Sequence, residues 1–525
     1  MSSAYRWAGL ALIALLVGTP LVGLGFSLLD RPVDPFTGVV APLLSVGVGV
    51  PALLARSVAL SVFVAVGAVT LGTWLAWVEY RTRVPRGWGL LTLLPLAMPS
   101  YLVAATVRSS LSPGGWIGDA LGLPHMTGFA MAVVVLTVIT APLVQLIVGA
   151  SLRNASAAEE EAALTLGASG RRVFWDITWP RLRPAVGFSG LIALLYAVSD
   201  FGAVAVLDVP VLTWRLYLAV ENQDVARASV LGAATLLALV PVFLASRALR
   251  GGVQHAGAAN FRRVQPVSAS ASERWMTVGV LVLVLGVGVV IPVSTLLVWV
   301  AEGWSRSLNF VTPWGALRDT VVVAVMGTAL TLVLAWLPAW VVANDQREGR
   351  HTGAMEDGIY LTSALPGVLL ALGLILAALR FTLPFGDRAY GIVLGSGALL
   401  MMGYATRFVA EVFAPLRVSF GAMDVRQLES AAVLGAGPFK RFRTVLLPTV
   451  APGVMVACLI GFNAIVKELP VTLLLGGATG VKTLSFRVWD RYNESLWHDA
   501  GVAGLCLVTL ALISAALTVR WRQNA

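Results

Sequence analysis

The chain has 525 residues, of which 58% are hydrophobic and 12% are charged, and its mean hydropathy is +0.84. This composition is typical of a polytopic membrane protein and excludes an ordinary water-soluble domain. The formal net charge of +10 could indicate nucleic-acid binding. Basic residues of membrane proteins gather in cytoplasmic loops, however, so we expect a lipid membrane and no nucleic acid as a partner.

Each membrane-spanning helix needs about twenty apolar residues, and this requirement predicts six spans on either side of a polar central stretch. The first six cover residues 7–29, 55–78, 88–108, 127–150, 184–207 and 228–248. The second six cover residues 275–299, 319–343, 358–379, 390–413, 452–476 and 499–519. We therefore predict an all-α polytopic membrane protein with a first half at 1–250, a cytoplasmic linker at 251–273 and a second half at 274–525. The stretch 7–29 is too long for a signal-peptide core, so we expect it to be a retained span.

Two charged segments, residues 155–183 and 423–451, interrupt the apolar chain and share one pattern. The first contains Glu161-Ala162-Ala163-Leu164-Thr165-Leu166-Gly167 and ends near Pro180. The second contains Glu429-Ser430-Ala431-Ala432-Val433-Leu434-Gly435 and ends near Pro448. The offset between equivalent residues is constant (429 − 161 = 268), so the two segments indicate an internal repeat.

Each segment is predicted to form a helix, a glycine break and a second helix. Ser156 with Glu159, and Asp424 with Gln427, have the spacing of a capping box at a helix N-terminus. Gly167 and its equivalent Gly435 suit the left-handed residue that closes such a helix. A basic, aromatic second helix then follows in both copies.

The pattern Glu-Ala-Ala-x-x-x-Gly, completed by Ile177 and Pro180, resembles the cytoplasmic coupling loop of binding-protein-dependent ABC importer permeases. In the second copy Val445 replaces the isoleucine and Ser430 the first alanine. The resemblance covers nearly the whole chain and is to fused double permeases, most of all those of ferric-iron importers. It implies two copies of a separate ABC ATPase subunit, which bind the ATP, and a solute-binding protein that delivers the cargo. It assigns ATPase coupling to Glu161, Ala162, Ala163, Gly167, Glu429, Ala431 and Gly435.

Loop charges set the predicted orientation. The side that carries Arg81, Arg83, both coupling segments and Arg347 holds most of the basic residues, so we expect it to be cytoplasmic. Both segments fall on one face only if each half has an even number of spans. We therefore expect both termini in the cytoplasm of a bacterial cell, a multi-pass inner-membrane location, and parallel repeats related by a pseudo-twofold axis along the membrane normal.

Ionisable residues inside predicted spans are costly and therefore informative. Asp200 follows the first coupling segment and Glu468 follows the second, again 268 residues apart (468 − 200), with Lys467 beside it. One interpretation is a buried ion pair of Lys467 with Asp200 or Glu468. The other is a translocation pathway formed by Asp200, Lys467 and Glu468, in which the two carboxylates transiently bind a metal cargo as hard oxygen donors.

Proline and glycine recur in the third span of each half, at 94–100 and 362–367. They predict either an ordinary helix kink or an interrupted helix beside a translocation pathway. The sequence leaves both interpretations open.

The cargo depends on weaker resemblances. Residues 199–204 and 467–475 are most similar to ferric-iron permeases, whereas thiamine importers, the alternative, carry the Asp-Phe-Gly phrase in the second half. A secondary transporter is a less favoured class because it has no need for duplicated ATPase-docking loops. No lysine follows a glycine, so the chain lacks a phosphate-binding loop and cannot itself hydrolyse ATP. The histidines are scattered, and Cys458 and Cys506 lie in apolar stretches, so neither a zinc site nor an embedded enzyme is expected.

Overall fold

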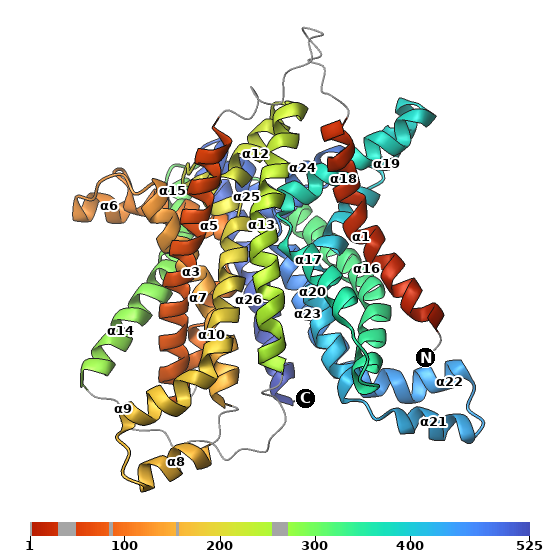
Figure 1. Cartoon of the computed structure of the whole chain (residues 1–525). Helices are drawn as coiled ribbons and strands as arrows, with labels where there is room; N and C mark the ends of the chain where they lie inside the picture. Colours follow the sequence, from red (N-terminus) through yellow and green to blue (C-terminus); the bar gives the residue numbers. More distant parts are fainter. Residues whose placement is uncertain (1–2, 30–48, 83–87, 154–156, 255–270, 525) are drawn as a thin grey trace. The chain divides into compact units, whose positions relative to one another are not determined.

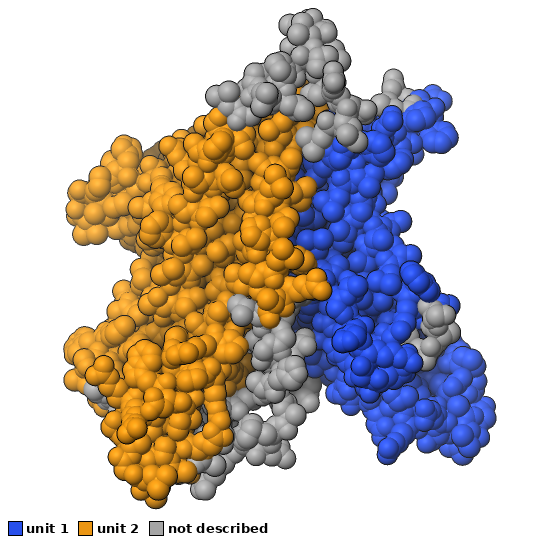
Figure 2. Space-filling model, in the orientation of Figure 1, with its two compact units in different colours: residues 1–41, 310–494, 502–525 blue, residues 42–309, 495–501 orange. Residues whose placement is uncertain are grey.

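The computed structural model describes residues 3–29, 49–82, 88–153, 157–254 and 271–524, and these ranges contain helices and no strand (Figure 1). The described chain forms two compact units (Figure 2). Unit 2 comprises its described residues between 49 and 309 together with 495–501, and unit 1 comprises 3–29, 310–494 and 502–524. The predicted all-α polytopic fold class is thereby confirmed.

Unit 2 contains five of the helices that are long and apolar enough to cross a membrane, together with shorter ones. Its elements are α3 (Val50–Arg81), α4 (Trp88–Leu91), η1 (Leu94–Ala97), α5 (Ser100–Leu111), α6 (Trp116–Leu121), α7 (Gly128–Arg153), α8 (Ala157–Thr165), α9 (Gly170–Val173), η2 (Phe174–Thr178), α10 (Trp179–Ser199), α11 (Gly202–Val206), α12 (Leu212–Glu221), α13 (Val225–Gln254), α14 (Ala271–Leu285), η3 (Gly286–Val290) and α15 (Ile291–Ser305).

The helices α3 and α7 run parallel. The ring of Phe63, in the first half of α3, lies 6.1 Å from that of Phe129 at the start of α7, and near the C-terminal ends of both helices a Cβ on Gly149 would lie 2.6 Å from the ring of Tyr80. The chain between two parallel neighbours must return to the end from which the first one started. This return is made by the helix pair Gly89–Ala97 and Ser100–Leu111, which is bent by 94°.

Unit 1 repeats this plan. Its elements are α1 (Ser3–Leu29), α16 (Trp314–Arg347), α17 (Gly353–Ala364), α18 (Gly367–Thr382), η4 (Leu383–Phe385), α19 (Asp387–Gly395), α20 (Ala398–Ala422), α21 (Val425–Val433), α22 (Pro438–Arg441), η5 (Phe442–Leu446), α23 (Leu447–Val466), α24 (Pro470–Gly476), η6 (Gly477–Thr479), α25 (Leu484–Asn493) and most of α26 (Trp497–Asn524).

The helices α16 and α20 are also parallel. Gly327 approaches Tyr404, and towards the other end the rings of Trp340 and Phe420 lie 5.3 Å apart. The connecting pair α17–α18 is bent by 102°. Both predicted third spans are therefore sharply broken helices rather than gently kinked ones.

The first predicted span of each sequence half packs against helices of the other half. In unit 1, α1 contacts α16, α17 and α18: a Cβ on Gly23 would lie 2.1 Å from the carbonyl oxygen of Gly373, so only glycine permits this approach. Arg6 forms an ion pair of 2.6 Å with Asp345, which places the start of α1 at the C-terminal end of α16. In unit 2, α14 and α15 contact α3 and α5.

Ten helices in the described residues are long and apolar enough to cross a membrane, or twelve if each bent pair counts as one span. This agrees with the predicted number. Three spans differ most in their bounds. The helix α10 ends at Ser199 rather than 207, and α23 ends at Val466 rather than 476, where Pro470 begins a separate short helix. The helix α20 covers 398–422 rather than 390–413, because Gly397 at a φ of 77° separates it from α19.

Candidate functional site

The first coupling segment consists of α8, a glycine turn and α9, and lies beyond the ends of α3, α7 and α10 in unit 2 (Figure 1). Gly167 has a φ of 87°, as predicted for a left-handed closing residue. The amide of Ala168 donates to the carbonyl of Ala163 and that of Gly167 to Leu164, both at 3.0 Å. This Schellman arrangement satisfies carbonyls that a helix end otherwise exposes.

The second coupling segment has the same construction from α21 and α22. Gly435 has a φ of 79°, and the amide of Ala436 donates to the carbonyl of Ala431 at 3.0 Å. Asp424 is the N-cap of α21, and its side chain accepts a hydrogen bond of 3.0 Å from the amide of Arg426. The predicted cap at Asp424 is thus confirmed, whereas Ser156 in the first segment lies outside the described residues.

Each coupling segment continues without interruption into a long apolar helix. A five-residue π-helical stretch, η2 or η5, joins α9 to α10 and α22 to α23. The resulting helices extend over Gly170–Ser199 and Pro438–Val466. Each coupling segment is therefore joined directly to a helix of membrane-spanning length.

The predicted coupling residues lie on the surface of both segments. Ala162, Gly167, Glu429 and Gly435 are exposed, and Glu161, Ala163 and Ala431 are partly exposed. Beside each glycine, at equivalent positions, the leucines Leu166 and Leu434 are 88% and 86% exposed. Val433, next to Leu434, is 88% exposed as well, so both segments present apolar side chains at the surface.

Glu160, which the sequence analysis did not single out, anchors the first segment. It is buried, and its carboxylate accepts two hydrogen bonds of 2.7 and 2.8 Å from Arg81 at the end of α3. The hydroxyl of Thr178 donates a third bond of 2.9 Å. The residue therefore fixes α8 to α3 and η2, while its neighbour Glu161 stays at the surface.

The second segment is anchored by apolar contacts instead. Leu428, the equivalent of Glu160, packs with Leu446 against the core cluster that contains Phe420. Arg347 at the end of α16 donates to the carbonyls of Phe420 and Met423, just before α21. The start of α1 and the second coupling segment therefore lie at the same end of unit 1.

Asp200 lies in unit 2 at the break between α10 and α11 and is buried. The hydroxyl of Ser100, the first residue of α5, donates to one carboxylate oxygen at 2.5 Å. The amide of Ala203 donates to the other at 2.9 Å, and Thr213 donates to the backbone carbonyl of Asp200 at 2.8 Å. Both carboxylate oxygens are thus engaged within unit 2.

Glu468 occupies the equivalent break in unit 1, between α23 and α24. Its carboxylate accepts a hydrogen bond of 3.1 Å from the amide of Val471, three residues later, as Asp200 does from Ala203. The same carboxylate lies against Gly367, the first residue of α18. Lys467 interacts electrostatically with Glu411 on α20.

Glu411 is a second residue that the sequence analysis missed. It lies near the middle of α20, is accessible to solvent although closely surrounded by protein, and interacts electrostatically with Arg407, Lys467 and Glu468. Because a carboxylate that faces lipid at mid-span is costly, we expect this face of α20 to line a water-accessible space. Arg407 itself donates to the carbonyls of Ser363 and Leu365 at the break between α17 and α18.

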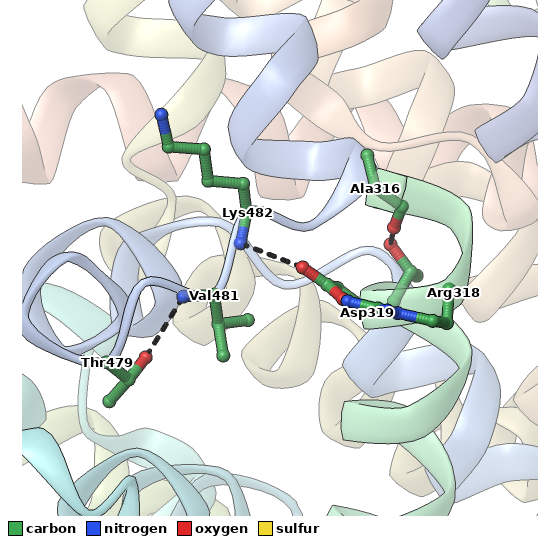
Figure 3. Close-up of polar contacts among 7 residues, drawn as sticks. Ala316, Arg318, Asp319, Thr479, Val481 and Lys482 are labelled. Atoms are coloured by element: carbon green, nitrogen blue, oxygen red, sulfur yellow. Dashed lines mark hydrogen bonds and ion pairs between the residues drawn. The ribbon is translucent and has the colours of Figure 1, made fainter. Parts of the chain in front are cut away.

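The chain after α24 is fixed to the start of α16 (Figure 3). The backbone amide of Lys482 donates to Asp319 at 3.5 Å, and the amide of Leu484 donates to Thr320 at 2.7 Å. Figure 3 shows the Lys482 side chain directed away from Asp319, so the contact is made by the backbone and not by the ammonium group. The chain between η6 and α25 is thereby tied to α16.

A family model described as the inner membrane component of binding-protein-dependent transport systems matches residues 68–255 and 346–523. The chain belongs to this family. It contains the permease domain twice, and its relatives are named as permease subunits of transport systems rather than enzymes. The family implies an ATPase, a solute-binding protein and a membrane as partners.

Three relatives of the permease match most of its length. The Fe(3+)-transport system permease protein FbpB 2 of Haemophilus influenzae is 27% identical over 479 residues, which cover 89% of this chain and 90% of the relative. The ferric transport system permease protein FbpB of Actinobacillus pleuropneumoniae is 23% identical, with 88% and 69% covered. The thiamine transport system permease protein ThiP of Salmonella typhimurium is 23% identical, with 85% and 84% covered.

Proposed function

We propose that this chain is the transmembrane permease subunit of an ATP-driven importer for ferric iron. Two exposed coupling segments, each continuous with a membrane helix, are the observation that carries the proposal. Each segment would dock on one copy of an ABC ATPase subunit, so two copies serve one permease chain. ATP would be bound and hydrolysed by those subunits, and this chain would hold no cofactor.

The topology we propose has both termini in the cytoplasm of a bacterial cell and the permease in its inner membrane. The ion pair between Arg6 and Asp345 supports this, because it holds the start of α1 at the end of unit 1 that carries the second coupling segment. The basic residues of that end fit a cytoplasmic location. As predicted from the sequence, the two sequence halves, 1–250 and 274–525, would then be parallel repeats about a pseudo-twofold axis along the membrane normal.

Ferric iron is the proposed cargo because a relative named for iron transport matches about nine-tenths of both chains. The thiamine permease of similar coverage keeps thiamine as the second candidate. The pathway is proposed to include Asp200, Lys467 and Glu468, and the two carboxylates would meet the cargo only transiently, because the protein itself hydrogen-bonds them. The exposed Glu411 adds a carboxylate to this set.

The cargo is tested by the ligand that co-purifies with the solute-binding protein of the same system. We expect ferric iron, detected by elemental analysis of the purified protein. Bound thiamine, detected by mass spectrometry, would replace iron as the cargo and leave the importer assignment in place. Uptake into cells that lack the ATPase subunit would instead contradict the ATP-driven class and favour a secondary transporter.

A further inference from the structure

We propose that Asp200 and Glu468 are positioning residues that fasten two broken helices together within each unit. Each acid would join the C-terminal end of the helix that continues from a coupling segment, α10 or α23, to the second helix of the bent pair, α5 or α18. Movement of a coupling segment would thereby be delivered to α5 in unit 2 and to α18 in unit 1. This inference deepens the proposed function and rests on the importer assignment, but not on the identity of the cargo.

The contacts of Asp200 carry the argument in unit 2. Its two carboxylate oxygens accept one hydrogen bond from Ser100 at the start of α5 and one from Ala203 in α11. A Cβ on Gly202 would lie 2.7 Å from the Cβ of Tyr101, so α11 and α5 are in close contact beside the carboxylate. Asp200 therefore bonds to both helices directly after the last residue of α10.

The contacts of Glu468 repeat this arrangement in unit 1. Its carboxylate accepts a hydrogen bond from Val471 in α24. A Cβ on Gly367 at the start of α18 would lie 2.9 Å from Glu468 Oε1 and 3.1 Å from Pro470, so these groups are packed against one another. The serine of unit 2 has no counterpart here, and close packing at a glycine takes its place.

Charge favours the same role. The carboxylates lie at the N-termini of α5 and α18, which have 12 and 16 residues, and the partial positive charge of a helix N-terminus stabilises an anion. The protein itself thus offsets part of the cost of burying each acid. A cargo cation at Asp200 would have to compete with Ser100 and Ala203 for oxygens that are already hydrogen-bonded and buried.

The path from the coupling segment is short and continuous. The helix that begins at Gly170, directly after the first glycine turn, extends to Ser199, one residue before Asp200. The corresponding helix in unit 1 extends from Pro438 to Val466, two residues before Glu468. Each acid therefore lies directly after the C-terminal end of the long helix that continues from a coupling segment. A displacement of that segment, carried along the helix, would reach the acid.

The first test compares a variant that removes the serine hydroxyl and leaves all charges in place with one that removes the charge of Asp200. Ser100→Ala, Asp200→Asn and the double variant are reconstituted in proteoliposomes with the ATPase and the iron-loaded binding protein. Because a hydrogen bond to a charged group contributes strongly, we expect each variant to lower iron uptake per ATP hydrolysed by about tenfold. The double variant should take up no less iron per ATP hydrolysed than the more impaired of the two single variants. Thr106→Val, which removes a buried hydroxyl bonded within α5 itself, is the matched control and should keep the normal ratio.

The same variants separate a fastening role from a cargo role. If Asp200 served only the cargo, Ser100→Ala would transport normally while Asp200→Asn would not, and the proposal would be overturned. Additive losses in the double variant would also overturn it, because the two residues would then act independently. In unit 1, Gly367→Ala pushes against Glu468 and should likewise lower the ratio, whereas Gly353→Ala, with open space around it, should not.

A second measurement does not depend on the cargo. Spin labels are placed at Leu111→Cys on α5 and Val58→Cys on α3, with Cys458 and Cys506 replaced by serine, and the distance between the labels is recorded with and without ATP in the assembled importer. We expect an ATP-dependent shift in this background and its loss in Ser100→Ala. A shift that persists in Ser100→Ala overturns the inference, even if iron proves to be the wrong cargo.

Discussion

The buried ion pair between Glu160 and Arg81 makes a quantitative prediction about the first coupling segment. Glu160→Leu introduces the residue that the second segment has at the equivalent position, Leu428. The change removes both acceptors of Arg81 and the acceptor of Thr178. The substitution therefore leaves a buried guanidinium at the end of α3 without the carboxylate that balances it.

The free energy lost in Glu160→Leu depends on how deeply the ion pair is buried. The side chains of Arg81 and Glu160 are only 6% and 11% exposed, so solvent screens their interaction weakly. Removing one partner of such a pair costs about 3–5 kcal/mol, because the other charge stays buried. Adding Arg81→Met should recover most of this loss, since apolar replacement of a whole buried pair is often neutral or stabilising. The control Glu159→Gln breaks the pair with Arg181, whose members are 52% and 44% exposed, and should cost at most about 1 kcal/mol.

Hydrogen exchange over residues 157–178 of the purified permease measures the local opening free energy. We expect Glu160→Leu to speed exchange in this segment by about two orders of magnitude or more, and the double variant to exchange nearly as the parent does. Substrate-stimulated ATPase activity should fall and recover in parallel. Unchanged exchange in Glu160→Leu would refute the view that this ion pair fixes the coupling segment.

Three further predictions concern coupling, pathway and topology. Glu161→Lys combined with Glu429→Lys inverts the charge on both docking surfaces. The double variant should lose substrate-stimulated ATPase activity while its insertion into the membrane stays normal. Normal stimulation would show that neither residue faces the ATPase. Glu411→Gln should lower uptake at least about tenfold with the amount of assembled importer unchanged, and normal uptake would remove this residue from the pathway. Cysteines at Arg350 and Gly303 should be labelled from the cytoplasm and from outside respectively, and a reversal would overturn the topology.

The spans and the two coupling segments could be predicted because their signals are local. Apolar length alone identifies α3 or α16, and the glycine at 167 or 435 is required wherever a helix closes with a left-handed residue. Such features depend on residues within a few positions of one another, so one sequence is enough to find them.

Contacts between distant residues could not be predicted in the same way. Glu160 is the buried member of the three consecutive glutamates 159–161 because it pairs with Arg81, 79 residues earlier in the chain. The helix break at Asp200 is invisible to a hydropathy window because the apolar stretch continues to 207. Glu411 is visible in the sequence as an acid within the predicted span 390–413, but its position beside Lys467 is not. The packing of α1 on α16 to α18 likewise depends on the close approach at Gly23 and Gly373, which no periodicity signals.

The central claim is that this permease carries ferric iron when a partner ATPase acts on its two coupling segments. Radiolabelled iron uptake into proteoliposomes that contain the permease, the ATPase and the iron-loaded binding protein tests it most directly. We predict uptake that requires ATP and stops when the ATPase cannot hydrolyse it. Iron uptake that continues without ATP, or ATP hydrolysis that is stimulated by the binding protein loaded with thiamine and not with iron, would contradict the account.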